Sequence, residues 1–277
     1  MSTQEPPELI AAVYDEDETA VLRLLRAGAD PETADGEGET ALYRAAVNGA
    51  AGIVRLLLQA GADPDRLSSR SDLPLCGAAS WGHTEAVRAL LAAGAAPDLA
   101  EEYGYRALTW AVRGGHEADL RALLAAGAAP DLAEEYGYRA LTWAVRGGHE
   151  ADLRALLAAG ADPDLPGPDG APPLVAAARR GSPGCVRALL EHGARGRREA
   201  LAEARRRLTV DIEADLRKGL ETGTPGCAYI TDRREDEPGT TTVEVTVVHR
   251  GLPAVGDSGQ TGHRAIAALL EAETEAG

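Results

Sequence analysis

The sequence predicts a mainly α-helical solenoid of stacked helix-turn-helix units, followed by a small α+β segment with one β-hairpin. Three series of residues that share a period of 33 residues predict the stack. Chance does not place three such series in phase, so the period defines the units. The series are a glycine before an alanine, a proline and a leucine: Gly28, Gly61, Gly94, Gly127, Gly160 and Gly193; Pro31, Pro64, Pro97, Pro130 and Pro163; and Leu42, Leu75, Leu108, Leu141 and Leu174.

Each unit is predicted to contain a polar hairpin loop and two short helices. In one unit the helices are Ala41–Val47 and Ile53–Gln59, with Gly49 between them. Helices of this length are marginal in isolation, so the apolar residues of the second helix must be buried against neighbouring units. We expect this burial for a repeated Leu-Leu pair: Leu24/Leu25, Leu57/Leu58, Leu90/Leu91, Leu123/Leu124, Leu156/Leu157 and Leu189/Leu190.

The glycine after the second helix is predicted to adopt the left-handed conformation of a C-terminal cap. The proline three residues later has no backbone N–H and prevents the helix from continuing. The chain therefore turns back toward the next unit.

Short motifs accompany the period. Thr40-Ala41-Leu42-Tyr43, Leu73-Pro74-Leu75-Cys76 and Arg106-Ala107-Leu108-Thr109 open the first helices, and Gly82-His83, Gly115-His116 and Gly148-His149 precede the second ones. With the Leu-Leu and Gly-Ala pairs, these residues resemble the ankyrin repeat, whose pattern runs T-P-L-H-x-A, G-H, L-L and G-A-D. The resemblance covers about residues 8 to 196, although no unit keeps the histidine of the first motif.

The period also predicts the domain organisation. Residues 1–196 form the solenoid: residues 8–34 lack the hairpin and the first-helix motif and are predicted to be an N-terminal cap, and five repeats occupy 35–196. Arg88–Ala128 is identical to Arg121–Ala161, which indicates a recent tandem duplication of one unit. A solenoid tolerates such a copy because its stability is a sum over units and their interfaces.

Residues 197–277 are predicted to be a helix, β-hairpin and helix extension. About 80 residues are few for an independent core, and the end of a solenoid exposes apolar surface, so we interpret the segment as a C-terminal cap on the fifth repeat. The expected elements are one or two helices in 197–221, strands at 227–231 and 241–248 around a loop at 235–239, a loop at 251–262 and a helix at 264–273.

Composition and charge exclude several classes of function. The net charge of −16 opposes binding to nucleic acid, which draws on Lys and Arg. The three cysteines show no metal-ligand or disulfide spacing, and no cofactor is predicted. The N-terminus lacks the pattern of a signal peptide and no apolar run is long enough for a membrane span, so we expect a cytoplasmic protein.

The basic residues give one indication of origin. Lys218 is the only lysine among 28 basic residues. This bias toward arginine is typical of a GC-rich genome, and we expect a bacterial, actinobacterial source.

The resemblance implies a concave binding surface formed by the hairpins and the ends of the first helices. In the first two repeats these positions hold Glu37, Glu39, Val47 and Asn48, then Arg70, Asp72, Ser80 and Trp81. Tyr and Arg are enriched at interface hot spots, although the tyrosines could instead pack on adjacent hairpins. Trp110 and Trp143 are expected in the core. The predicted partner-binding residues are Trp81, Tyr103, Tyr105, Arg113, Tyr136, Tyr138 and Arg146.

Two motifs suggest other chemistry. His116-Glu117, and its copy in the next repeat, lack the second histidine of a zinc motif, so no metal site is predicted. Gly256-Asp257-Ser258-Gly259 is similar to the nucleophile loop of trypsin-like proteases, a family that needs two β-barrels; Ser258 is expected to cap the following helix instead.

The sequence thus favours a protein-protein interaction module, acting as an adaptor, scaffold or inhibitor, without a catalytic site. The alternative is a hydrolase-like enzyme in which Cys227, His249 and Asp257 form a thiol triad and the repeats present the substrate. The basic cluster from Arg195 to Arg207 is interleaved with Glu199 and Glu203, which indicates a solvated face or a contact with acidic repeats.

Overall fold

The computed structural model describes residues 7–207, 227–237, 240–249, 252–260 and 262–272. Its contacts divide the chain into two compact units. The first unit comprises Met1–Trp143 with Ala158–Ala161, and the second comprises Ala144–Leu157 with Asp162–Gly277.

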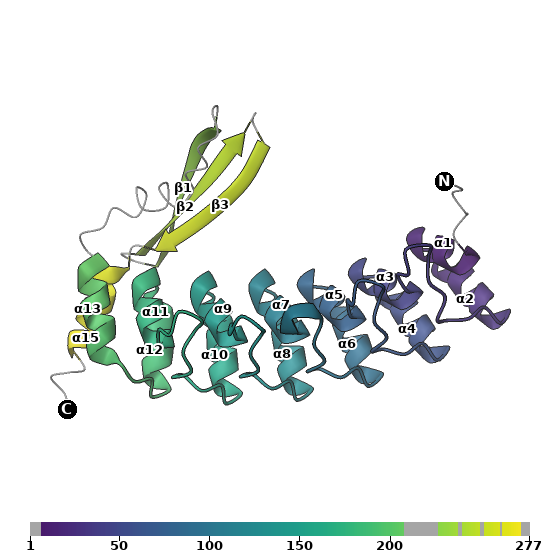
Figure 1. Ribbon diagram of the computed structural model, residues 1–277, viewed down its shortest axis with the longest axis horizontal. Helices are drawn as coiled ribbons and strands as arrows, with labels where there is room; N and C mark the ends of the chain where they lie inside the picture. The colour runs from purple at the N-terminus through teal and green to yellow at the C-terminus, as the bar shows by residue number, and fades with distance from the viewer. Residues whose placement is uncertain (1–6, 208–226, 238–239, 250–251, 261, 273–277) are drawn as a thin grey trace. The chain divides into compact units, whose positions relative to one another are not determined.

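The first unit is built from successive pairs of short helices (Figure 1). Its elements are α1 (Glu8–Tyr14), α2 (Glu18–Arg26), α3 (Ala41–Val47), α4 (Ala51–Gln59), α5 (Pro74–Ser80), α6 (Thr84–Ala92), the 3-10 helix η1 (Glu102–Gly104), α7 (Ala107–Gly114) and α8 (Glu117–Ala125); α9 (Ala140–Gly147) begins in it. The helices α3, α5 and α7 pack on one another, and so do α4, α6 and α8. The unit therefore has the two layers of helices that the repeat predicts.

Residues 8–34 contain both helices of a pair, although they lack the first-helix motif. The helix α1 buries Leu9, Ile10 and Val13 and packs against α2 and α3. Apolar residues at helical spacing are therefore enough to form the first helix at this end of the chain.

Periodic leucines form the core of the first unit. Leu42, Leu75 and Leu108 of the first helices are at most 4% exposed. In the Leu-Leu pairs of α4, α6 and α8, the first leucine is fully buried and the second is only half-buried. In these three pairs the second leucine is less buried than predicted, because consecutive helix residues point about 100° apart and the first leucine faces the neighbouring helices most directly. In the second unit, Leu157 is only 5% exposed, so the pair Leu156/Leu157 is buried as predicted.

The predicted glycine caps are confirmed in this unit. Gly61 has φ 98° and Gly94 has φ 94°, both in the left-handed region. The N–H of Ala62, one residue later, donates to the carbonyl of Leu57 at 3.0 Å, which is the bond of a Schellman cap. Glycine is required because a side chain at these angles would be strained.

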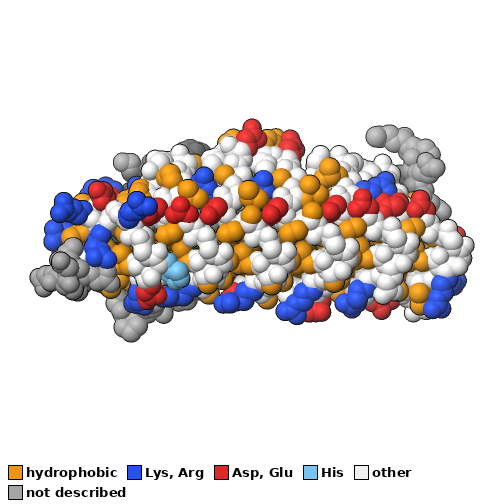
Figure 2. Space-filling view, turned by 90° about the horizontal axis from the view of Figure 1, so that it is seen from below, with side chains coloured by type: hydrophobic (Ala, Val, Ile, Leu, Met, Phe, Trp, Pro, Cys, Tyr) orange, Lys and Arg blue, Asp and Glu red, His pale blue; other side chains and the backbone are white. Residues whose placement is uncertain are grey.

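A second periodic interaction joins each inter-repeat loop to the next. The carboxylate of Asp65 accepts a hydrogen bond from the N–H of Ala96 at 3.0 Å, and that of Asp98 accepts one from the N–H of Ala129 at 2.9 Å. Each repeat thus satisfies a backbone donor of its successor. Figure 2, which views the molecule from the side of the second helices, shows acidic side chains recurring across this face.

The histidine of the Gly-His motif binds the preceding repeat. His83 donates from Nε2 to the carbonyl of Val47 at 2.9 Å, and His116 donates to the carbonyl of Ser80 at 3.3 Å. A Cβ on Gly49 would lie 2.5 Å from the His83 ring, so the glycine makes room for the imidazole. These histidines therefore have a structural role.

The second unit contains the last helix pairs and the C-terminal elements. These are α10 (Glu150–Ala158), α11 (Pro173–Arg180), α12 (Pro183–Glu191), α13 (Arg197–Arg207), the strands β1 (Cys227–Glu237), β2 (Thr240–His249) and β3 (Leu252–Gln260), and α15 (His263–Ala272). The helices α13 and α15 pack against each other and against α11. His263 donates from Nε2 to the carbonyl of Arg179 at 3.1 Å, and α15 buries Ile266 and Leu270.

The arginine-rich segment near α13 is engaged within the second unit. Arg195 lies 2.7 Å from the carboxylate of Asp164, and Arg205 lies 2.7 Å from that of Glu271. The pair of Arg195 with Asp164 is a contact with an acidic residue of a repeat, one of the two interpretations of the basic cluster, whereas Glu271 belongs to α15.

The three strands form an antiparallel sheet in the order β1-β2-β3. Cys227 pairs with His249 in β1 and β2, and both strands extend beyond the predicted limits. The prediction of a loop at 251–262 is wrong, because β3 occupies most of it and pairs with β2 despite its glycines. Ladder hydrogen bonds come from the backbone, so turn-forming residues do not exclude a paired strand.

Two further expectations fall on this region. Ser258 lies within β3 opposite Glu244, so it does not cap α15. Residues 208–221 of the predicted helix segment lie outside the described residues.

The burial pattern of α8 predicts different effects for two adjacent leucines. Leu123→Ala should lower the free energy of unfolding by roughly 2 to 5 kcal/mol, because it removes a fully buried side chain and leaves a cavity. Leu124→Ala, its matched control, should cost clearly less because Leu124 is half-buried. Urea unfolding followed by circular dichroism measures both, and equal losses would contradict the assignment of the core.

Nearest-neighbour packing predicts that one copy of the duplicated repeat is dispensable for folding. Deletion of residues 96–128 joins Ala95 to Ala129 in the same register and should leave a shorter, cooperatively folded solenoid. Circular dichroism during thermal unfolding tests this. A broad, non-cooperative transition in the deletion variant would refute the nearest-neighbour account.

Candidate partner-binding surface

We use the term hairpin face for the surface formed by the hairpin loops and the C-terminal ends of the first helices. Trp81 lies directly after α5 on this face, and 66% of its surface is exposed. An indole this exposed contributes little to folding, and large exposed aromatic surface is typical of binding sites. Trp81, one of the predicted partner-binding residues, is thus accessible to a partner.

The tips of two consecutive hairpins carry exposed tyrosines. Tyr103 is 48% exposed and Tyr136 is 59% exposed, and their rings stack with centroids 6.2 Å apart. The backbones of the hairpins are also joined, since the N–H of Glu135 donates to the carbonyl of Tyr103 at 2.9 Å. The two rings therefore form one preorganised aromatic patch in solvent.

The two tyrosines have identical neighbours in sequence but different backbone conformations. Tyr103 lies in the left-handed region at φ 61°, whereas Tyr136 does not have a positive φ. For a residue with a side chain this conformation costs about 1 to 2 kcal/mol. The ring stacking in the pair offsets part of that cost, because stacked aromatic pairs contribute about 0.5 to 1.5 kcal/mol beyond area burial.

A second layer of aromatic rings lies behind the tips. Tyr105 stacks on Trp110 with centroids 5.0 Å apart, and Tyr138 stacks on Trp143 at 4.5 Å. Both tryptophans are half-buried. The prediction that they pack in the core is therefore wrong: they pack against the tyrosines and take part in the hairpin face.

Two carboxylates hold these indoles in place. Trp110 donates from Nε1 to Glu101 at 2.9 Å, and Trp143 donates to Glu134 at the same distance. Burial raises the pKa of both glutamates, although the indole hydrogen bonds favour the ionised form. Glu101 also accepts a bond from the N–H of Leu73, so it ties the tryptophan to the preceding hairpin.

Sequence reasoning missed both glutamates. They occupy a position of the period where the first two repeats have Asp35 and Ser68, whose side chains accept bonds from backbone N–H groups of their own hairpins. The longer glutamate reaches an indole instead. The change from Asp and Ser to Glu, in the repeats that also carry tryptophan, is the signal that could have identified them.

Arg113 lies against the rings. Its guanidinium carbon is 4.8 Å from the ring centroid of Trp110, 4.5 Å from that of Trp143 and 5.3 Å from that of Tyr105. A guanidinium over an aromatic face contributes about 0.5 to 1 kcal/mol at an exposed site. Arg113 therefore stabilises the ring arrangement across two repeats. We call this set the aromatic cluster: Tyr103, Tyr105, Trp110, Arg113, Tyr136, Tyr138 and Trp143.

Arg106 supports the cluster from the backbone side. Its guanidinium donates to the carbonyls of Asp98, Gly104 and Ala133 at 2.9 to 3.1 Å. These bonds join two hairpins and leave the side chain half-buried. Arg146, also predicted to bind the partner, belongs to the second unit and lies exposed near the end of α9.

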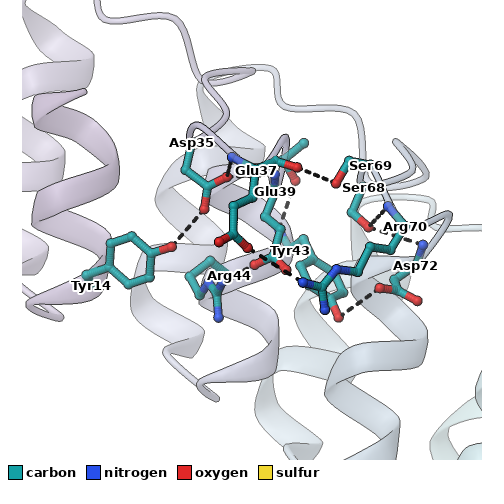
Figure 3. A network of polar contacts seen from close by, with 11 residues as sticks. Tyr14, Asp35, Glu37, Glu39, Tyr43, Arg44, Ser68, Ser69, Arg70 and Asp72 are labelled. Carbon is teal, nitrogen blue, oxygen red and sulfur yellow. Dashed lines mark hydrogen bonds and ion pairs between the residues drawn. The ribbon is translucent and has the colours of Figure 1, made fainter. Parts of the chain in front are cut away.

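The hairpin loops of the first two repeats carry a network of polar contacts (Figure 3). The hydroxyl of Tyr14 donates a hydrogen bond to the carboxylate of Asp35 at 2.8 Å. This carboxylate also accepts hydrogen bonds from the N–H groups of Glu37 and Glu39. Arg44 forms an ion pair with Glu39. These contacts fix the first hairpin to the helices beneath it.

The same network reaches the second hairpin (Figure 3). Ser69 donates its hydroxyl to the carbonyl of Glu37, and Arg70 lies 3.6 Å from the carboxylate of Glu37. Tyr43 bonds to Asp72, and burial, followed by the charge of Asp72, raises the pKa of Tyr43 to about 12. Of the predicted surface residues, Glu37 and Arg70 pair with each other, whereas Glu39 and Asp72 pair with Arg44 and Tyr43.

The register of the sheet does not bring the three residues of the alternative enzyme site together. Cys227 pairs with His249, but Asp257 pairs with Val245, four residues before His249 along β2. At about 3.3 Å per residue this separation is roughly 13 Å along the strand. An orienting carboxylate must lie within hydrogen-bond distance of its histidine. In the described residues no group of three His, Cys, Asp or Glu side chains is arranged to bind a metal.

Comparison with known proteins identifies the repeats. The family description "Ankyrin repeats (3 copies)" matches residues 9–101 and 75–167, and "Ankyrin repeat" matches 169–196. A comparison with curated proteins gives no match. None of the helices in the described residues has the length and apolar character needed to cross a bilayer.

Solved structures agree with the family match. The crystal structure of an ankyrin repeat domain from Acinetobacter baumannii is 30% identical with a TM-score of 0.65, and covers 68% of this chain and 98% of its own. The ankyrin repeat protein EF0377 is 29% identical with a TM-score of 0.63, and the match covers 68% of this chain and 99% of EF0377. The ankyrin repeat domain of Bcl-3, a member of the IκB family, is 27% identical with a TM-score of 0.63, and the match covers 68% of this chain and 87% of the Bcl-3 domain. The chain therefore belongs to the ankyrin repeat family.

Proposed function

We propose that the chain is a protein-interaction module that binds its partner through the hairpin face, with the aromatic cluster at the centre of the contact. The exposed, stacked pair of Tyr103 and Tyr136 carries this proposal. Tyrosine and tryptophan dominate interface hot spots because they offer large contact areas. Rings that are already ordered also lose little entropy on binding.

The geometry assigns different roles to the predicted binding residues. Trp81, Tyr103 and Tyr136 are the exposed contacts. Tyr105, Tyr138 and Arg113 hold the tryptophans and support those contacts from behind. Arg146 remains a proposed contact of the second unit.

The remaining features are consistent with an adaptor, scaffold or inhibitor. We propose residues 1–196 as the binding solenoid and 197–277 as an extension that caps it, since α13 and α15 cover α11. Binding of a protein partner, and not of nucleic acid or a cofactor, follows from the net charge of −16 and from the composition of the hairpin face. A cytoplasmic location fits the unpaired cysteines Cys76 and Cys185, both buried.

The exposed tyrosines should separate binding from folding. The double variant Tyr103→Ala/Tyr136→Ala should weaken partner binding by at least about 2 kcal/mol, the scale of a hot spot, with little change in thermal stability because both rings are exposed. The partner is first isolated by affinity capture with the intact chain as bait. Isothermal titration calorimetry then measures its affinity for each variant.

Leu99→Ala/Leu132→Ala is the matched control, because these residues are 39% and 38% exposed and occupy equivalent positions of the same two repeats outside the hairpin tips. Wild-type affinity in the tyrosine variant, or an equal loss in the leucine variant, would show that the hairpin face is not the binding site.

A further inference from the structure

Exposed acidic side chains lie beside the exposed tyrosines. Glu102 and Glu135 are exposed and directly precede Tyr103 and Tyr136 at the hairpin tips. A hydrogen bond to Glu102 and the negative charge of that carboxylate raise the pKa of the Tyr103 phenol. Each tip therefore presents an aromatic ring beside a carboxylate.

Two basic residues that follow Tyr103 in the same repeat, Arg106 and Arg113, are already engaged within the chain. The guanidinium of Arg106 donates to three backbone carbonyls, and that of Arg113 lies over the faces of three rings. Their capacity to recognise an acidic partner is correspondingly reduced. The net charge of −16 adds a long-range field that attracts cations and repels anions.

We propose that the partner presents a basic segment, whose Lys or Arg side chains bind against the Tyr103–Tyr136 pair beside Glu102 and Glu135. This proposal rests on the proposed function of the hairpin face and names the chemistry of its partner. Tyrosine faces attract ammonium and guanidinium groups, and adjacent carboxylates accept hydrogen bonds from them.

The spacing of the rings further limits the segment. Their centroids are 6.2 Å apart, and two residues of an extended chain span about 6.6 Å. An extended segment with basic residues two positions apart therefore matches the spacing of the two tips, so that Glu102 and Glu135 can each accept hydrogen bonds from one cation. The preferred pattern is a basic residue, any residue and a second basic residue.

A random dodecapeptide library displayed on phage tests the proposal, with the full-length chain as the immobilised target. Peptides retained by the wild-type chain, and not by Tyr103→Ala/Tyr136→Ala, should carry net positive charge and show the two-residue spacing of Lys or Arg. The most enriched peptide, labelled with fluorescein, is then titrated with each variant by fluorescence anisotropy.

The charge variants separate local recognition from general attraction. The double variant Glu102→Gln/Glu135→Gln should lower the affinity for the peptide about tenfold or more. Glu85→Gln/Glu117→Gln removes the same number of charges from α6 and α8, where these glutamates pair with Arg88 and Arg121, and should weaken it less than about twofold. Equal losses in both variants would overturn the proposal.

The library also distinguishes the two proposals if one fails. Retained peptides that are neutral or acidic, yet depend on Tyr103 and Tyr136, would overturn the basic segment and leave the hairpin face as a binding site. If the wild-type chain retains no peptide beyond those retained by the tyrosine variant, the role of the exposed tyrosines fails, and with it the inference about their partner.

Discussion

Burial of leucine between neighbouring repeats is the constraint on which the rest of the structure depends. A helix of seven to nine residues such as α3 or α4 cannot persist alone, so each helix pair is stable only where Leu57, Leu90 or Leu123 meets the next pair. The glycine caps and the bonds from Asp65 and Asp98 to the following loops then fix the direction in which the next pair begins. Because this framework is independent of the hairpin tips, the tips are free to vary.

The aromatic cluster shows what the duplication of one repeat adds to this framework. Arg113 of one repeat lies over Trp143 of the next, and Tyr103 stacks on Tyr136. Neither contact exists in a single repeat, so two adjacent copies create a surface that one copy lacks. The position one period after Trp143 is Ala176, and the one after Tyr136 is Asp169. The following repeat therefore lacks the tryptophan and the tip tyrosine of the two duplicated repeats.

Sequence periodicity predicts those features that every repeat shares, and fails for those that depend on one pair of neighbours. The first helix at Ala41–Val47, the glycine caps and the buried leucines follow from local patterns that recur. The half-buried position of Trp110 does not, because it depends on Glu101, which accepts the indole N–H and is not apolar. In the same way, β3 was missed because its pairing with β2 is made by backbone atoms and leaves no pattern in the side chains.

Identical sequence does not make the two copies equivalent as binding surfaces. Tyr103 has a left-handed backbone and stacks on the tyrosine of the next repeat, Tyr136. Tyr136 does not have a positive φ, and the equivalent position of the repeat after it is Asp169. Contact with the next copy offsets part of the strain at Tyr103, and the second tip carries no such strain. Tyr136 is also the more exposed ring, at 59% against 48%. A partner that spans both tips therefore meets two rings that differ in backbone conformation and in exposure, so the duplicated repeats form an asymmetric pair of contacts.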